Sequence, residues 1–150
     1  MAPAYAAFAP LDPFFELVQR GLSGLVDGEH YFDTIAEHAI FEFRYDFPGF
    51  PRQVVGRDAL MALYLGYGNN IVLHRADSLV VHRCDDGHVV VIEYDVYGRV
   101  VANNALWVGV AGAVYENRFA SIVTIDNRKI VHWRDYMDSL SAMRALSTKT

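Results

Sequence analysis

The sequence predicts a single α+β domain, in which helices come first and the strands of an antiparallel sheet follow. Apolar residues recur at helical spacing after Asp12 and again over Gly56–Tyr67, which indicates two helices packed on a core. From Ile71 onward, β-branched and aromatic residues mostly alternate with polar ones, as in half-buried strands. Short polar turns at 85–87 and 126–129 separate these strands. Neighbouring strands are therefore expected to pair as hairpins.

The N-terminal part of the chain is predicted to be mainly helical. The first helix is expected from Asp12 to about Asp27, with Asp12 as its N-cap and Pro13 at the first helical position, where no N–H is needed. A second, shorter helix is expected over Tyr31–Glu37. Residues 1–11 contain two prolines and are expected to form an N-terminal arm.

Strands dominate the rest of the predicted order. The first is expected over Ala39–Phe47, where aromatic residues alternate with charged ones. Ile71–Cys84 and His88–Tyr97 are expected to form a hairpin. The segment Val100–Val114 alternates poorly and is expected to combine a strand end with a mobile loop. After the last strand, Ser139 is expected to cap a final helical turn or two.

The last predicted hairpin, Tyr115–Asp138, contains the candidate chemistry. Its turn holds Asn127, which can adopt a positive φ. In the second strand, the period of two places Asp135 on a face with three apolar residues, Val131, Trp133 and Met137. A carboxylate on such a face loses hydration. Its pKa is therefore expected to rise toward the range that a general acid or base needs near neutral pH.

Composition narrows the class of protein. With 53% hydrophobic residues, the 150-residue chain can bury one substantial core, so residues 1–150 are expected to form one domain. The net charge is −5 and the 13 Lys and Arg residues are scattered, so nucleic acid is not an expected partner. No apolar run is long enough to span a membrane, so no membrane association is expected. Cys84 is the only cysteine, which excludes an internal disulfide and fits a reducing cytoplasm, the expected location.

No cofactor or metal ion is expected. The six histidines lack the helical spacing with a nearby acid that is typical of zinc sites, and a single cysteine cannot form a cysteine cage. The glycines at 109 and 112 lack the serine of a nucleophile elbow, and no phosphate-binding glycine loop is present. Nucleotide-dependent and serine-hydrolase functions are therefore not expected.

Two C-terminal segments and one internal segment carry a family resemblance. Tyr115–Phe119 (YENRF) and Trp133–Asp138 (WRDYMD), with the turn between them, resemble the final hairpin of SnoaL-like proteins, which belong to the nuclear transport factor 2-like superfamily. Gly56–Leu60 (GRDAL) is similar to the start of the third helix in that family. The resemblance extends over about residues 12–146. It implies a cone-shaped fold, in which a strongly curved antiparallel sheet wraps around a pocket closed by the N-terminal helices.

The same resemblance implies roles for single residues. The tail from Met137 is similar to that of the phenazine-biosynthesis A and B proteins, whose acid/base glutamate corresponds to Asp135 and whose pocket tyrosine corresponds to Tyr115. Their pocket histidine corresponds to Leu63, so that set is incomplete here.

Other catalytic sets of the superfamily match less well. The tyrosine of ketosteroid isomerases falls on Gly21, and their general-base aspartate falls on Phe43 or near Asp46. Of the Asp-Arg-Asp set of limonene epoxide hydrolases, Asp135 matches the last member, while the other two positions fall on Tyr94 and Val96. The resemblance therefore favours neither steroid isomerisation nor epoxide hydrolysis by that set.

These observations predict one site. Asp135 and Tyr115 are the candidate catalytic residues, and the candidate substrate-binding residues are Asn117, Trp133, Met137, Phe119, Phe43, Tyr94, Leu63 and Asp46. The predicted function is a cofactor-free acid/base enzyme of cyclase, isomerase, dehydratase or condensing type, acting on a small hydrophobic or polycyclic ligand. The alternative is a non-catalytic ligand-binding or dimerisation module of the same fold.

Two further hypotheses accompany this site. Asp135 could instead be structural, paired with Arg118, Arg134 or backbone donors. A homodimer is also expected, through the outer face of the sheet, where apolar and charged residues mix as in interfaces of moderate polarity: Tyr136, His132, Arg118, Ile122 and Glu93.

Overall fold

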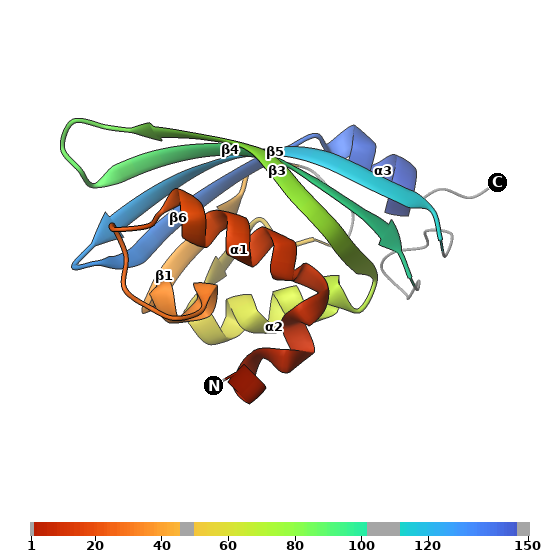
Figure 1. Ribbon diagram of the computed structural model, residues 1–150, viewed down its shortest axis with the longest axis horizontal. Helices are drawn as coiled ribbons and strands as arrows, with labels where there is room; N and C mark the ends of the chain where they lie inside the picture. The colour runs from red at the N-terminus through yellow and green to blue at the C-terminus, as the bar shows by residue number, and fades with distance from the viewer. Residues whose placement is uncertain (1, 46–49, 102–111, 147–150) are drawn as a thin grey trace.

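The computed structural model describes residues 2–45, 50–101 and 112–146 (Figure 1). Two 3-10 helices and three α-helices accompany six strands in these ranges. The helices are η1 (Ala2–Leu11), α1 (Asp12–Gly21), η2 (Tyr31–Thr34), α2 (Arg57–Gly68) and α3 (Ser139–Leu146). The strands are β1 (Ile35–Phe43), β2 (Gln53–Val55), β3 (Ile71–Arg83), β4 (Val89–Val100), β5 (Val114–Asp126) and β6 (Lys129–Met137).

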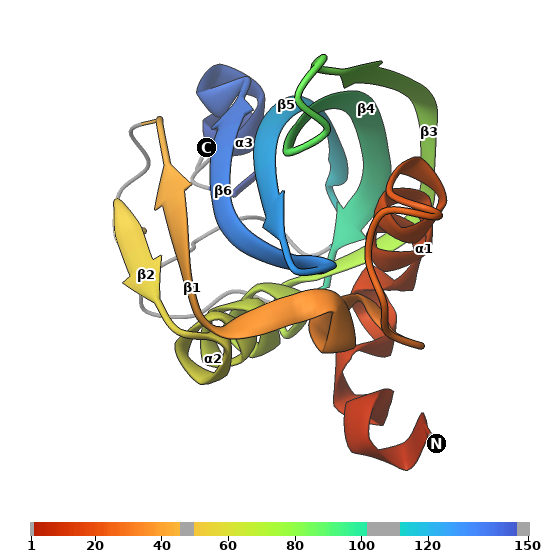
Figure 2. The same ribbon diagram turned by 90° about the vertical axis from the view of Figure 1, so that its left-hand side faces the viewer.

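All six strands form one sheet, in the order β2-β1-β6-β5-β4-β3. The pair β1–β6 is parallel, and all other neighbouring pairs are antiparallel. The sheet bends strongly, with α1 and α2 on its concave side, while α3 packs against β5 (Figures 1 and 2). The predicted α+β class, with helices packed on a curved sheet, is confirmed.

Irregularities in the edge strand β3 contribute to the curvature. The register between β3 and β4 shifts between Leu73 and Arg75 and again between Asp77 and Val80. Bulges of this kind bend a strand and increase its twist. Opposite the first shift lies Gly98, where an added Cβ would collide with the backbone of β3, so only glycine allows the close approach of the two strands.

Helix α1 ends earlier than predicted, at Gly21 instead of Asp27. The chain then forms tight turns, in which Leu25 N donates to Leu22 O at 2.9 Å and Gly24 takes a φ of +84°. The apolar side chains of this turn still pack on the core, which explains their helix-like spacing in the sequence. The cap assignments also differ. Leu11 precedes the helix in the N-cap position, and Asp12 lies inside the first turn.

The predicted second helix is only one 3-10 turn, and β1 begins at Ile35 instead of Ala39. His30 is the N-cap of this turn, with its ring Nδ1 accepting from Phe32 N at 3.1 Å in a capping box, and the turn ends because Ile35 is already extended as the first residue of β1. A register shift between Ile35 and Ile40 then interrupts the alternation of β1. Because of this shift, the apolar residues on either side of it are spaced as in a helix, which explains the predicted second helix.

The observed strands and the last helix also differ from the prediction. Strand β2 was not expected, since Gln53–Val55 is too short to show a period. The C-terminal helix is capped by Asp138 instead of Ser139, with Asp138 Oδ1 accepting from Leu140 N at 3.1 Å. Strand β1 ends at Phe43, and residues 46–49, which include Asp46, lie outside the described residues. Most of the predicted 100–114 loop lies outside them too, although β4 continues to Val100.

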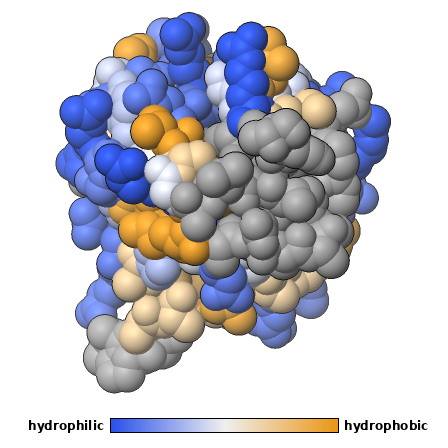
Figure 3. Space-filling view, turned by 90° about the vertical axis from the view of Figure 1, so that its right-hand side faces the viewer, coloured by the Kyte–Doolittle hydropathy of each residue, from blue (hydrophilic) through white to orange (hydrophobic). Residues whose placement is uncertain are grey.

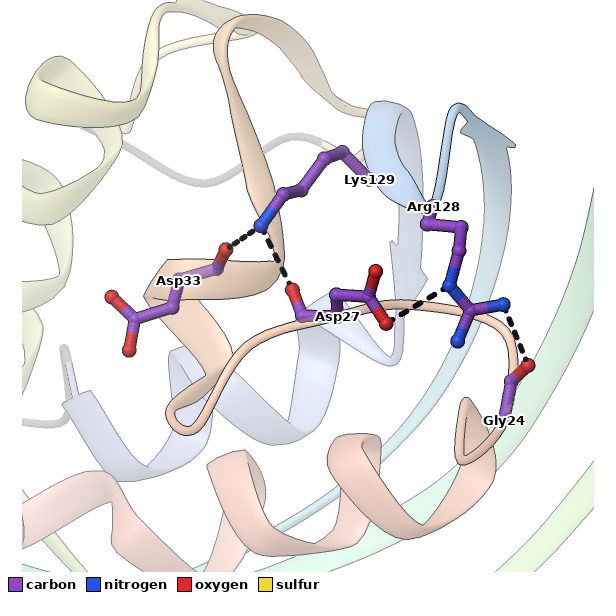
Figure 4. A network of polar contacts seen from close by, with 5 residues as sticks. All are labelled: Gly24, Asp27, Asp33, Arg128 and Lys129. Atoms are coloured by element: carbon purple, nitrogen blue, oxygen red, sulfur yellow. Dashed lines mark hydrogen bonds and ion pairs between the residues drawn. The ribbon is translucent and has the colours of Figure 1, made fainter.

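The turn between β5 and β6 fastens the N-terminal half to the C-terminal hairpin (Figure 4). Asn127 takes the expected positive φ, 51°, and Arg128 takes 61°. Arg128 Nε donates to Asp27 Oδ1 at 2.9 Å, and Lys129 Nζ donates to the carbonyl oxygens of Asp27 and Asp33 at 2.9 and 2.8 Å. The loop between α1 and η2 is thereby held at the tip of the hairpin that carries Asp135.

The N-terminal arm is an ordered part of the core. Tyr5 Oη donates to Asp33 Oδ1 at 2.5 Å, and the Tyr5 ring stacks on His30 with centroids 4.3 Å apart. Leu11 is buried next to Gly68 at the end of α2. None of the helices in the described ranges combines the length and the apolar character that a membrane span requires.

Candidate functional site

A cavity of about 50 Å³ lies between the helices and the concave face of the sheet. Among the described residues that line this cavity, Asp135 is the only one with an acidic or basic side chain that can be charged at neutral pH. The other lining residues are aromatic or aliphatic: Leu11, Phe14, Phe43, Tyr45, Phe50, Tyr64, Tyr67, Leu73, Tyr94, Val96, Phe119 and Met137. A single carboxyl group therefore faces a space with mostly apolar walls.

One oxygen of Asp135 is held by the protein, and the other is not. Ser121 Oγ donates to Asp135 Oδ1 at 2.5 Å, and Trp133 Nε1 donates to the same oxygen at 2.9 Å. Both distances are typical of hydrogen bonds to an ionised carboxylate. Among the described residues, no side chain or backbone group donates to Oδ2. Because Asp135 lines the cavity, Oδ2 is the oxygen available to a ligand.

A third residue extends this set of hydrogen bonds. Tyr94 Oη lies 3.2 Å from Ser121 Oγ. Since a serine hydroxyl has one proton and that of Ser121 goes to the carboxylate, Tyr94 must be the donor to Ser121. The hydrogen bonds therefore run in one direction, with Tyr94 donating to Ser121 and Ser121 donating to Asp135. They begin at a side chain that itself lines the cavity.

Burial raises the pKa of Asp135 to about 6, even though the hydrogen bonds from Ser121 and Trp133 each lower it. Asp135 is 5% exposed, and within the described chain no basic side chain forms an ion pair with it. Arg118 and Arg134 belong to the opposite face of the sheet, and the Nε of Arg134 has no hydrogen-bond partner there among the described atoms. The hypothesis of a structural aspartate paired with either arginine is therefore wrong.

Tyrosine hydroxyls surround the carboxyl group. Those of Tyr45 and Tyr64 form no hydrogen bond with any described residue, and both residues line the cavity. The Tyr31 hydroxyl is fully buried and interacts with that of Tyr64, but without hydrogen-bond geometry. Burial raises the pKa of each of these hydroxyls well above its usual value near 10, with Asp135 adding to the rise. They remain neutral donors at physiological pH.

A second polar cluster lies at the Tyr115 position. Tyr115 Oη accepts from Tyr67 Oη at 2.9 Å and from Asn117 Nδ2 at 3.1 Å. Asn117 also contacts Met137 Sδ at 3.3 Å, and its Oδ1 accepts from the backbone N of Arg118. Burial raises the pKa of Tyr115, while these two donors lower it. In this cluster Tyr67 is the residue that lines the cavity, and Tyr115 lies behind it.

A family model describes most of the chain. The model of the SnoaL-like domain matches residues 18–133. The chain belongs to the SnoaL-like family. The protein YesE of Bacillus subtilis (strain 168), itself uncharacterized, is 28% identical to this SnoaL-like chain over 109 residues, which are 73% of this chain and 69% of the relative.

Solved structures share the fold. A candidate isomerase from Bacillus subtilis superposes with a TM-score of 0.68 at 23% identity, covering 97% of this chain and 95% of its own. A phenazine biosynthesis-related protein from Pseudomonas aeruginosa gives 0.68 at 20% identity, with 98% and 91% covered. A candidate polyketide cyclase from Silicibacter sp. TM1040 gives 0.70 at 13% identity, with 96% and 97% covered. At these identities the likeness concerns the nuclear transport factor 2-like fold.

The structure brings part of the predicted site together in this SnoaL-like cavity. Asp135, Phe43, Tyr94, Phe119 and Met137 line it, as the alternation of their strands predicts. Trp133, Tyr115 and Asn117 lie behind the wall and contact lining residues through hydrogen bonds. Leu63 is half-buried but is not a lining residue, and Asp46 lies outside the described residues.

Sequence reasoning missed several residues of the site. Tyr64 and Tyr67 belong to the same helical stripe as Leu63, and their hydroxyl groups were the available signal. Ser121 shares a strand face with Tyr115, so its position could be predicted, but its contact with Asp135 depends on the register of β5 with β6, in which the two residues are paired. The contributions of Leu11 and Phe14 depend on how the N-terminal segment packs.

Proposed function

We propose that this SnoaL-like protein binds a small hydrophobic ligand and transfers protons to or from it with Asp135. The observation that carries the proposal is a buried carboxylate that faces an apolar cavity, with no partner for its Oδ2 and no neighbouring cation in the described part of the chain. A pKa of about 6 leaves Asp135 mostly ionised at neutral pH, so it acts first as a base. The resulting carboxylic acid can return the proton to another atom of the ligand.

The neutral tyrosines are suited to the other half of such a reaction. When a carbon next to a carbonyl group loses a proton, negative charge develops on the carbonyl oxygen and is stabilised by hydrogen-bond donors. The hydroxyl of Tyr45 has no described partner, that of Tyr64 interacts with the Tyr31 hydroxyl, and both interact electrostatically with Asp135. Isomerisation, cyclisation and dehydration can all start from this proton abstraction.

The cavity volume constrains the ligand. An apolar cavity that binds benzene measures about 150 Å³, which is larger than the cavity here, about 50 Å³. Ligand binding therefore requires some lining side chains to move. Half-buried lining residues are less tightly packed than fully buried ones and can move more easily; they are Tyr45, Phe50, Tyr67, Phe119 and Met137. A flat ligand of one or two rings needs the smallest displacement.

Proton exchange with the solvent tests the proposal without knowledge of the natural substrate. Small aromatic ketones would first be screened for binding by the rise in melting temperature that they cause. For those that bind, wild type in D2O is expected to exchange the hydrogen next to the carbonyl group, and Asp135→Asn is expected to bind but not to exchange it. Equal exchange by both proteins would contradict the assignment of Asp135.

A non-catalytic binding module is the second candidate, and exposed apolar side chains favour it. At the end of the molecule that carries α3, apolar areas lie between hydrophilic ones (Figure 3). Val114 is 58% exposed and Leu140 56% exposed there. If ketones and related compounds bind but wild type exchanges no hydrogen faster than buffer alone, this module becomes the better description.

A homodimer through the outer face of the sheet remains part of the proposal. Tyr136 is 37% exposed on this face. Two other expected interface residues already have partners within the chain, since His132 Nε2 lies 2.6 Å from Glu42 Oε2 and His82 Nε2 lies 2.7 Å from Glu93 Oε2. Such pairs lower the cost of burying charge in an interface.

A further inference from the structure

We propose that Ser121 and Trp133 are positioning residues, which hold Oδ1 of Asp135 against the sheet and thereby direct Oδ2 at the ligand. This inference rests on the proposed function of Asp135 and goes beyond it, because it assigns roles to two residues that do not line the cavity. Ser121 and Trp133 are both 0% exposed. Their contacts with Asp135 measure 2.5 and 2.9 Å and meet on a single oxygen.

The sheet explains why these donors meet the carboxylate. Ser121 of β5 is paired directly with Asp135 of β6, so their side chains emerge side by side on the concave face. Trp133 precedes Asp135 by two residues on the same strand and therefore faces the same way. Phe41 stacks on the Trp133 ring with an interplanar angle of 15°, which fixes the direction of the indole N–H.

Two fixed donors on one oxygen limit the rotation of a carboxyl group. If the Asp135 side chain turned about its last bond, Oδ1 would lose both hydrogen bonds while remaining buried, which is costly for an ionised group. Tyr94 reinforces the arrangement, because it occupies the acceptor capacity of Ser121 and leaves the Ser121 proton for Asp135. The orientation of Oδ2 is thus set by the strands and not by the ligand.

The same contacts control the charge of the carboxyl group. Hydrogen bonds to the ionised form oppose the effect of burial on its pKa. The other titratable groups that interact with Asp135 are tyrosines from five elements or their ends, all with a pKa raised by burial: Tyr31, Tyr45, Tyr64, Tyr94 and Tyr115. These remain neutral between pH 4 and 9. Within the described part of the site, titration in that range belongs to Asp135.

Nuclear magnetic resonance can follow this titration in the full-length protein without a substrate. The 13C signal of the Asp135 carboxyl group, identified by its loss in Asp135→Asn, reports the ionisation directly. The indole N–H of Trp133 is a second reporter, since it touches the titrating oxygen and the chain has only one other tryptophan, Trp107.

The expected result is a titration midpoint that rises when either donor is removed. One charge-assisted hydrogen bond corresponds to a shift of the midpoint by about one pH unit, so Ser121→Ala and Trp133→Phe are each expected to titrate about one unit above wild type. Ser121→Thr, which keeps the hydroxyl, should return the midpoint toward the wild-type value. Ser78→Ala removes an exposed hydroxyl and is the matched control, with an unchanged midpoint.

Two outcomes would overturn the inference. One is a midpoint that stays at the wild-type value in both Ser121→Ala and Trp133→Phe, with at most a lower melting temperature, because the two residues would then be only structural. The other is failure of Ser121→Thr to restore the midpoint while folding normally. Neither outcome concerns catalysis. The proposed function fails by a different result, hydrogen exchange by Asp135→Asn that equals that of wild type, so the two failures can be told apart.

Discussion

Individual tyrosine hydroxyl groups in the N-terminal part of the chain differ in whether they have a hydrogen-bond partner, and this difference has consequences for stability. The Tyr31 hydroxyl is buried without a hydrogen-bond partner among the described residues, whereas the Tyr5 hydroxyl donates to Asp33 at 2.5 Å. A buried hydroxyl group without a hydrogen-bond partner lowers the free energy of unfolding, whereas a hydrogen-bonded one raises it. The two tyrosines therefore form a natural comparison for the same substitution.

We expect Tyr31→Phe to raise the free energy of unfolding by about 1 kcal/mol and Tyr5→Phe to lower it by about the same amount. Urea unfolding monitored by circular dichroism measures both. Tyr97→Phe is the control, because the Tyr97 ring under Arg75 is retained and its hydroxyl has no described partner. If Tyr31→Phe is less stable than wild type, the Tyr31 hydroxyl of wild type must form a hydrogen bond, and this interpretation would be wrong.

At the scale of single residues, alternation along the strands predicts which side chains face the cavity. Asp135 shares the concave face with Trp133 and Met137 as predicted, because no register shift falls between them. The same alternation places Ile130 on the outer face with His132 and Tyr136, yet Ile130 is fully buried. A shift between Thr124 and Ile125 reverses the alternation at the start of β6. Bulges of this kind depend on pairing between distant strands and have no local signature.

Among the elements, the hairpin turns and the bounds of α2 could be predicted from the sequence, whereas the lengths of α1 and η2 could not. The positive φ of Asn127 follows from its residue type, and so does the hairpin that it closes. The lengths of α1 and η2 instead depend on tertiary contacts, which include the pairing of Ile35 with Ile130 of β6 directly after η2 and the hydrogen bonds from the β5–β6 turn to the loop after α1. The tyrosines of α2 are a related case, since only packing against the sheet decides which of them reaches the cavity.

The contact between the β5–β6 turn and the α1–η2 loop leads to a prediction. Lys129 Nζ satisfies two backbone carbonyl groups, so Lys129→Met leaves both without this donor. We expect the free energy of unfolding to fall by roughly 1–2 kcal/mol. Arg83→Met is the control, since Arg83 is exposed and forms no ion pair with a described residue. Equal effects of the two substitutions in urea unfolding would show that these two hydrogen bonds of Lys129 do not stabilise the fold.

At the scale of the whole molecule, the curved sheet has a concave face filled by the helices and a convex face that is largely free of described helices apart from α3 near β5 (Figures 1 and 2). The convex face carries the residues proposed for a homodimer, with Tyr136 exposed near its centre strands. The fold thus separates the candidate ligand site on one face from the proposed interface on the other.

Analytical ultracentrifugation tests the proposed homodimer. At micromolar concentration we expect a species of about twice the chain mass of 16.9 kDa. Tyr136→Glu should shift the equilibrium toward the monomer, because it places an uncompensated charge at the interface. Leu65→Glu, on exposed α2 surface, should not. Sedimentation of wild type only at the monomer mass would reject the dimer.

Asp135 is a buried carboxylate with a raised pKa and, among the described residues, no ion-pair partner. Its pKa of about 6 in the folded protein exceeds the value near 3.9 of an unfolded chain, so the folded state binds the proton more tightly. Ionisation therefore destabilises the fold. The contribution of Asp135 to stability is largest below about pH 4, falls as the pH rises to about 6, and is constant above that. The total loss is on the order of 3 kcal/mol.

The difference in the free energy of unfolding between Asp135→Asn and wild type, measured from pH 3.5 to 8, tests this claim most directly. Asparagine keeps an oxygen that can accept from Ser121 and Trp133 but carries no charge. Groups that titrate equally in both proteins cancel in the difference. We predict that the variant gains stability relative to wild type between about pH 4 and 6 and is at least as stable at pH 7. A variant that is clearly less stable than wild type at pH 7, with a difference that grows as the pH rises, would contradict the account.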